Sequence, residues 1–284
     1  MNPNPVSSPH HVHPGQGQAA TYGRAPSWKQ RIDTSLSHKL LVPALTAMVV
    51  TACAVIGSIL YSAQGMREDR LHGVEWAAVH TQNKIDRAFF ERYGDVQAFG
   101  LNHEFHQNLG AMDPAARREV TVLLNSLTKT YGCYDLIVVL DPAGRVVAVN
   151  TADPSGQELP EARSLIGRSL SGDESFQLAK AGKFTTDNSK GALTGTVVSD
   201  PAKDELVAHV YGGRAPAWNM KFTAPIIDDE DGSIHGYMQN YFNSNTIIEP
   251  IVAEMYDALK DEGLHSAEFT VVDRHGNLLV EVDP

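Results

Sequence analysis

Residues 136–150 read LIVVLDPAGRVVAVN, and this stretch predicts a β-hairpin. Residues 136–140 form a short, continuous apolar run of the kind found in buried strands. Asp141-Pro142-Ala143-Gly144 is a turn with proline at its second position, and residues 145–150 supply the return strand. Because long helical patterns precede this hairpin, the chain is predicted to have an α+β fold whose sheet begins here.

The hairpin recurs close to the end of the chain. Residues 272–280, VDRHGNLLV, reproduce residues 140–148, LDPAGRVVA, in the position of the turn and in the apolar pattern. A repeat spaced by about 132 residues indicates two related α/β modules in series. We expect the first module to occupy residues 131–246. The second begins at residues 247–284 and is cut off after one hairpin, so we expect the chain to be the front part of a longer protein or the product of a broken gene model.

The rest of the first module is predicted from shorter patterns. A second hairpin is expected from residues 224–227 and 234–241 around an acidic turn, and a short helix from residues 172–182. Residues 185–217 look like loop. The acidic turn, residues 228–231, invites a calcium interpretation, but it lacks the alternating oxygen ligands of a calcium loop, which favours a solvated turn. The second module should open with a helix at residues 247–262.

Two helices are predicted before the first hairpin, and together they fill residues 63–130. Residues 66–102 form a long helix, and a second helix is signalled by Asp113-Pro114, an N-cap followed by proline at the first helical position. Apolar residues recur in the long helix at steps of three and four: Val79, Ile85, Phe89, Tyr93, Val96 and Phe99.

A membrane span precedes the long helix. The chain has no charged side chain between Lys39 and Arg67, and residues 40–61 are almost wholly apolar. At about 1.5 Å per residue, this run reaches roughly 33 Å, the thickness of a bilayer's hydrocarbon core. We expect residues 40–62 to be a single transmembrane helix in contact with lipid. Residues 1–39, rich in Pro, Gly, Ser, Gln and His in their first part, should be a disordered tail.

The charges indicate orientation and exclude one class of partner. The tail carries Arg24, Lys29, Arg31 and Lys39 against Asp33, which favours a cytoplasmic tail and an outer C-terminal domain. A cleaved signal peptide is the alternative. However, the 39 residues before the apolar run are long for a signal peptide, and residues 61–64 are a poor cleavage site. The whole chain has a net charge of −11, so the part outside carries about −14. Such a surface argues against nucleic acid as a partner.

The sequence shows no catalytic or metal-binding motif, and we expect neither an enzyme within these residues nor a cofactor or metal. Cys53 lies in the span and Cys133 outside it, so the two cannot pair within one chain. His103 and His106 are three residues apart on a helix end, but no third ligand follows nearby, which favours two surface residues.

The loop-rich stretch before the second hairpin holds the best candidates for a binding site. It brings together Asp200, Tyr211, Arg214 and Trp218 among glycines. Arg can pair with a carboxylate, Asp can accept from an ammonium, and aromatic faces can enclose a small cation or apolar group. The alternative is that Trp218 belongs to the core and Arg214 is a solvated loop residue.

These features, in their order along the chain, resemble the extracytoplasmic sensor region of bacterial transmembrane receptors of the double-Cache class. The resemblance rests on the anchor, the long helix, the hairpin at residues 136–150, and the segments 165–183, 224–236 and 247–280. It covers about residues 65–284. It implies a PAS-like antiparallel sheet with flanking helices in the membrane-distal module, which would hold a small ligand such as an amino acid or organic acid.

The resemblance also implies a function and a set of site residues. We expect the sensing part of a chemotaxis transducer in the inner membrane, with a cytoplasmic N-terminus, a periplasmic domain and a homodimeric assembly. Many amino-acid-binding members have Arg and an aromatic before the residue that Phe176 resembles, whereas Asp173, Glu174 and Ser175 stand there in this chain. The residues expected to bind the ligand are Phe176, Asp187, Asp200, Tyr211, Arg214 and Trp218.

Two other functions remain open from the sequence. The same membrane anchor and sensor region could belong to a membrane histidine kinase or a diguanylate cyclase. The chain could also be a membrane-anchored binding protein that does not signal.

Overall fold

A computed structural model describes residues 28–105, 109, 112–186, 195–213, 217–228 and 230–282; for residues 28–38 and 40 it describes only the backbone. The chain divides into two compact units, Met1–Arg67 and Glu68–Pro284. His10, His11 and His13 of the tail, and His106, lie outside the described residues.

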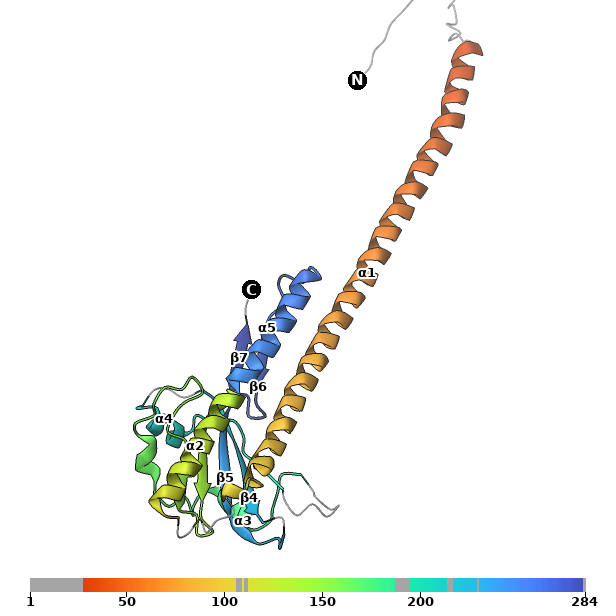
Figure 1. Ribbon diagram of the computed structural model, residues 1–284. Helices are drawn as coiled ribbons and strands as arrows, with labels where there is room; N and C mark the ends of the chain where they lie inside the picture. Colours follow the sequence, from red (N-terminus) through yellow and green to blue (C-terminus); the bar gives the residue numbers. More distant parts are fainter. Residues whose placement is uncertain are drawn as a thin grey trace, which may run out of the picture. The chain divides into compact units, whose positions relative to one another are not determined.

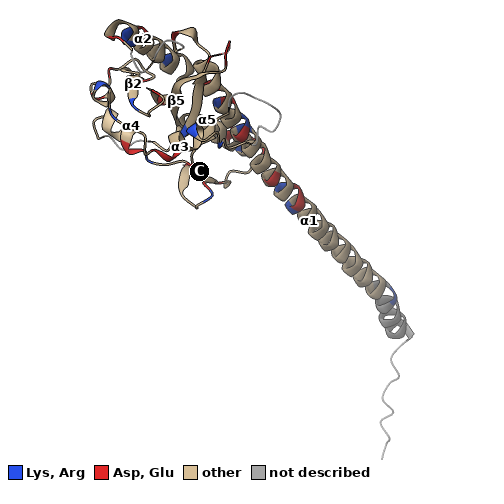
Figure 2. Ribbon diagram, turned by 90° about the horizontal axis from the view of Figure 1, so that it is seen from below, with Lys and Arg blue, Asp and Glu red and all other residues tan. Residues whose placement is uncertain are grey.

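The first unit contains the apolar half of helix α1, Trp28–Gly100. Figure 2 shows the uncharged stretch of α1 that begins after Lys39 and ends at the charged residues from Arg67 onward. Its apolar side chains, Leu45, Val49 and Ile56 among them, are exposed. In the described residues, α1 is the one helix long and apolar enough to cross a membrane. The helix begins at Trp28, inside the segment 1–39 that we expected to be disordered.

The second unit is built on a five-stranded antiparallel sheet with the order β2-β1-β5-β4-β3 (Figure 1). Its strands are β1 (Tyr134–Leu140), β2 (Val146–Val149), β3 (Val197–Val198), β4 (Asn219–Ile227) and β5 (Ile234–Asn243). Both predicted hairpins are confirmed, β1–β2 and β4–β5. The α+β class is therefore confirmed, with a long N-terminal helix and helices flanking an antiparallel sheet.

One face of the sheet packs on the C-terminal part of α1 and on α2 (Pro114–Tyr131). Asp113 caps α2 as predicted, because its carboxylate accepts from the N–H groups of Ala115 and Ala116. α1 contributes Val96 and Phe99 to this core, which bury their side chains against the alternate residues of β1, β4 and β5. Burial of each such side chain stabilises the fold by about 1.5–3 kcal/mol.

The opposite face, which we call the inner face, is covered by the 3-10 turn η3 (Ala162–Leu165) and by helices α3 (Glu174–Lys180) and α4 (Glu205–Val210). The prediction that residues 185–217 form a loop is wrong in part, because β3 and α4 lie within this segment. Both elements are short: β3 has 2 residues and α4 has 6, too few for a periodic pattern to show in the sequence.

In the last part of the chain, helix α5 (Asn245–Asp261) lies beside the hairpin of β6 (Phe269–Val272) and β7 (Leu278–Val282) (Figure 1). Pro250 lies within α5, close to its start. Ile248 and Val252 of α5 pack with Leu279 of β7 and Ile85 of α1. The hairpin expected at residues 272–280 is confirmed.

The two repeated turns have the same hydrogen bonds. Asp141 Oδ1 accepts from the N–H groups at residues 143 and 145, and Asp273 Oδ1 accepts from those at residues 275 and 277. Gly144 and Gly276 both have φ of 82°, a left-handed conformation that favours glycine. The sequence repeat is therefore also a structural repeat at the level of the turn.

Candidate functional site

Polar side chains form a continuous strip on the inner face, along the paired strands β4 and β5. In the register of this ladder, Asn219 lies opposite Asn243, Lys221 opposite Tyr241 and Thr223 opposite Gln239. Side chains of alternate residues point to the same face of a sheet, so all six face η3, α3 and α4. These six residues, with the carboxylates of Asp135, Asp173 and Asp204 that meet them, are called the polar strip below.

Lys221 lies at the centre of the polar strip. Its ammonium donates to Asp173 Oδ2, lies 3.9 Å from Asp204 Oδ2, and sits 5.2 Å from the centre of the Tyr241 ring. The side chain is only 14% exposed. Two carboxylates and an aromatic face thus surround one cation, which is the arrangement that proteins use to hold an ammonium group.

Asp173 and Asp204 also cap the two helices that cover the strip. Asp173 Oδ1 accepts from the N–H of Phe176, and Asp204 Oδ1 accepts from the N–H groups of Leu206 and Val207. Gln239 donates to Asp173 Oδ1 at 2.8 Å. Burial alone would raise the pKa of Asp173, but the charge of Lys221 and these hydrogen bonds outweigh it and hold that pKa below its usual value.

Asp135 closes one end of the strip, at a bulge in β1. Its carboxylate accepts from Asn219 Nδ2 at 2.8 Å and from Asn243 Nδ2 at 3.2 Å, and its backbone carbonyl accepts from the Tyr211 hydroxyl. Burial raises the pKa of Asp135, because the two amide donors do not fully offset the loss of water.

Two buried polar atoms of the strip have no hydrogen-bond partner. Thr223 is fully buried and Asn219 is 3% exposed, yet Thr223 Oγ1 and Asn219 Oδ1 contact no donor. A buried polar group without a partner costs free energy, so such atoms mark places where a ligand or an ordered water completes the structure.

The predicted site residues are not brought together. Phe176 is fully buried in the core beneath α3, with its ring 5.0 Å from that of Tyr237. Tyr211 reaches Asp135, at the edge of the strip. Trp218 packs in the apolar cluster of α5 and β7, which favours the core interpretation. Asp187 and Arg214 lie outside the described residues.

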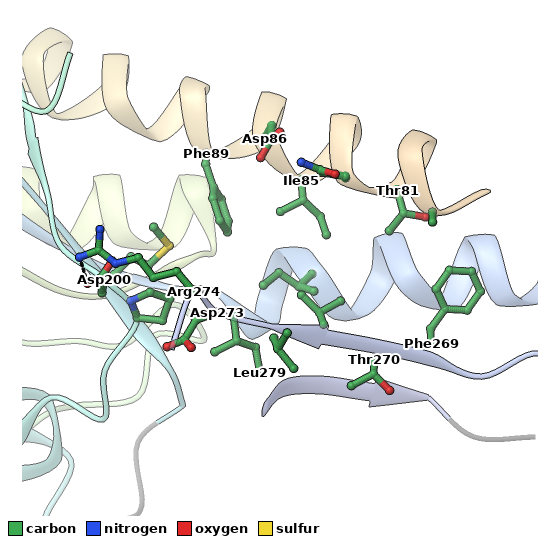
Figure 3. A pocket seen from close by; sticks show the side chains of 17 residues that line it. Thr81, Ile85, Asp86, Phe89, Asp200, Phe269, Thr270, Asp273, Arg274 and Leu279 are labelled. Carbon is green, nitrogen blue, oxygen red and sulfur yellow. Dashed lines mark hydrogen bonds and ion pairs between the residues drawn. The ribbon is translucent and has the colours of Figure 1, made fainter. Parts of the chain in front are cut away.

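Asp200 lies elsewhere, at the rim of an apolar cavity of about 500 Å³ between α1, α5 and the β6–β7 hairpin. In Figure 3, Thr81, Ile85 and Phe89 of α1 lie on one side of the cavity and Phe269 and Leu279 on the other. The Asp200 carboxylate is already engaged with Arg274 and His275. The cavity therefore offers apolar volume, whereas the polar strip offers the hydrogen-bonding groups.

Sequence reasoning missed the centre of the strip. In residues 220–224, polar and apolar side chains alternate, which is the period-two pattern of a strand with one polar face. This pattern could have extended the predicted strand from residue 224 back toward Asn219, where β4 begins. Asp173 and Asp204 each stand one residue before a helix, the position of an N-cap.

Within the described ranges, no group of three or more His, Cys, Asp and Glu side chains is arranged to hold a metal ion. His103 lies in the short 3-10 turn His103–Phe105. The acidic turn after β4 is a hairpin turn, in which Asp228 accepts from the N–H of Glu230, and Asp231 from that of Ser233.

No family model matches the chain, and no curated protein matches it. Among solved structures, the sensor domain of the Vibrio cholerae histidine kinase DctB matches with a TM-score of 0.48 and 13% identity, over 73% of this chain and 64% of that one. This chain thus spans less than two thirds of that structure.

Two further structures are similar to this chain. The sensory domain of the Campylobacter jejuni chemoreceptor Tlp3 with isoleucine bound matches with a TM-score of 0.48 and 13% identity, over 72% of this chain and 67% of that one. The Escherichia coli DcuS sensor domain matches with a TM-score of 0.38 and 15% identity, over 61% of this chain and 98% of that one. All three structures are sensor or sensory domains.

Proposed function

We propose that this chain is the ligand-sensing part of a membrane-anchored bacterial signalling receptor of the double-Cache class, and that its output is chemotaxis. One observation carries the sensing function: a buried polar strip, covered by the capped ends of two helices, holds two polar atoms without partners. Such atoms can form hydrogen bonds with a bound molecule.

The length and composition of α1 support the proposed membrane arrangement. Residues 40–62 span the inner membrane, with the basic tail in the cytoplasm and residues 63–284 in the periplasm. Residues 63–130 are the helical entry to the first module, residues 131–246 bind the ligand, and residues 247–284 open the second module. We place the ligand at the polar strip rather than among the six residues expected from the sequence.

The strip has a direct physical connection to α1. Tyr241 faces the strip, and its neighbour Phe242 projects to the other face, where its ring lies 5.7 Å from that of Phe89 on α1. Nearby, the Tyr134 hydroxyl donates to Asp95 of α1 at 2.7 Å. A ligand that shifts β5 relative to β4 therefore changes the surface on which α1 rests, and α1 continues into the span.

A homodimer through α1 would carry this change across the membrane. Beyond the span, α1 exposes several large apolar side chains that a second copy could cover: Leu71, Val74, Trp76, Val79 and Phe90. Single cysteines at residues 76 and 79 should crosslink between copies in membranes under oxidising conditions, whereas a cysteine in place of Glu119 on α2 should not. Equal crosslinking at all three positions would count against this dimer.

The test of sensing uses the whole chain in lipid nanodiscs. Its unfolding temperature is followed against amino acids, including isoleucine, and against organic acids, polyamines and purines. A ligand at 100 times its Kd should stabilise the folded state by about 2.7 kcal/mol. The shift should be smaller in Thr223→Val and unchanged in Thr121→Val on α2. A folded protein that none of these compounds stabilises would contradict the proposed function.

The type of output is decided by the DNA that follows codon 284. A long heptad hairpin there would identify a chemotaxis transducer, whereas a kinase or cyclase signature would identify a signalling enzyme.

A further inference from the structure

The atoms of the polar strip that lack partners are all able to accept hydrogen bonds. Asn219 commits its Nδ2 group to the Asp135 carboxylate, so the atom left over is the carbonyl oxygen Oδ1. The Thr223 hydroxyl can accept as well as donate. A ligand that completes this site must therefore bring N–H or O–H groups.

The charges of the strip favour the same conclusion. Within the described residues, the carboxylates of Asp173, Asp204 and Asp135 meet the strip. Lys221 is the cation beside Asp173 and Asp204, whereas Asp135 is bound by the amides of Asn219 and Asn243. Lys221 is bound to Asp173, and its Nζ is 3.9 Å from Asp204 Oδ2, beyond hydrogen-bond distance. Asp204 thus keeps an oxygen with capacity for a second cationic donor.

The geometry of Lys221 shows that the strip can hold an ammonium. Its Nζ is bound by a carboxylate and lies over the face of Tyr241. The aromatic ring belongs to a fully buried residue, so water competes little for the cation at this point. Lys221, the one cationic member of the strip as defined above, is already engaged with Asp173.

Resting on the proposed function, we propose that the ligand of the polar strip is an organic amine that needs no carboxylate for recognition. Its ammonium binds Asp204 Oδ2 beside Lys221, and a second donor on the same molecule reaches Asn219 Oδ1 or Thr223 Oγ1. Asn219 and Thr223 are separated along β4 by roughly 13 Å, so one ammonium cannot serve both. Diamines and longer polyamines are the chemical class that best fits donors spread along the strip.

A matched set of four-carbon compounds tests this class by isothermal titration against the whole chain in nanodiscs. The set is 1,4-diaminobutane, butylamine, 4-aminobutanoate and butanoate, with spermidine, valinamide, valine and 3-methylbutanoate as a second set. The proposal expects the tightest binder to be an amine without a carboxylate, and no binding by the two simple acids. A tightest binder that carries a carboxylate would overturn the amine class while leaving the sensing function intact.

Two variants give the sign of the recognised charge. Lys221→Met removes the positive charge of the strip, so amine affinity should stay the same or rise, whereas recognition of an anion would fall tenfold or more. Asp204→Asn keeps an oxygen to cap α4 but removes the negative charge, so amine affinity should fall tenfold or more. Asp113→Asn, an N-cap on α2 outside the strip, should leave affinity unchanged. An Asp204→Asn protein with unchanged amine affinity would overturn the proposal.

Binding of nothing in either set, or in the wider panel above, would remove the proposed function itself. Failure of the amine class and failure of sensing are therefore distinguishable.

Discussion

The Asp200 carboxylate accepts a hydrogen bond from the Arg274 guanidinium, and this ion pair joins the loop after β3 to the turn between β6 and β7. The preceding residue, Ser199, is bound to the strip: its Oγ accepts from the N–H of Lys221 at 2.9 Å, and its N–H donates to the Lys221 carbonyl. The first sheet and the second hairpin are thus connected through two adjacent residues.

A double-mutant cycle of Asp200→Asn and Arg274→Gln should give a small coupling energy. The two side chains are 40% and 73% exposed, so solvent screens the pair and we expect about 0.2–1 kcal/mol. Urea unfolding of the two single variants and the double variant measures it. The more informative readout is hydrogen exchange in β6–β7. Ligand should slow exchange there in the original protein and not in Asp200→Asn, and equal protection in both would exclude this connection.

Gly236→Ala should be strongly destabilising. A Cβ atom at Gly236 would lie 2.3 Å from the Leu140 carbonyl oxygen and 2.7 Å from Leu109 Cδ1, so the β1–β5 pairing must shift to accept it. We expect a loss of about 2–4 kcal/mol, measured by urea unfolding. Gly172→Ala is the matched control, since its added Cβ would meet nothing within 4 Å. Similar losses in both variants would show that the strand pairing near Gly236 is not as described.

Asp173 should give the protein an acid-sensitive component of stability. Its pKa lies below the usual value in the folded state, so the folded protein binds fewer protons than the unfolded chain below about pH 4. This contribution is complete above the unfolded pKa and is lost as the pH falls through the folded pKa. Asp173→Asn should flatten the decline in unfolding free energy below about pH 4. An unchanged acid limb in this variant would contradict the Asp173–Lys221 pairing.

Ile56→Arg should impair insertion of α1 into the membrane. A positively charged side chain near the centre of a span costs about 2.5–3.5 kcal/mol in insertion measurements. The fraction of chain inserted, read from carbonate extraction of membranes, should fall. Val79→Arg, outside the predicted span, should leave insertion unchanged. Equal extraction of the two variants would argue that residues 40–62 are not the span.

The elements defined by local chemistry could be predicted from the sequence. The turns at Asp141 and Asp273 carry their own hydrogen bonds, and Asp113-Pro114 starts a helix through contacts within a few residues. Such signals depend on neighbouring residues alone, so a single sequence shows them.

The binding strip could not be predicted in the same way, because its contacts join distant parts of the chain. Lys221 and Asp173 are 48 residues apart, and Asn243 and Asp135 are 108 apart. No pattern among neighbouring residues indicates that these side chains meet. The polar and aromatic residues that cluster in the sequence include Trp218, whose ring packs into the core near α5. Closeness in sequence was a poor guide to closeness in the fold.

The double duty of Asp173 and Asp204 restricts how this site can change over evolutionary time. Each carboxylate holds a helix end as well as a charge, so replacement by an aliphatic residue would loosen α3 or α4 together with recognition. Thr223 supports no other element through its side chain in the described contacts. A related receptor that responds to a different ligand is therefore expected to differ first at Thr223 and to keep Asp173 and Asp204.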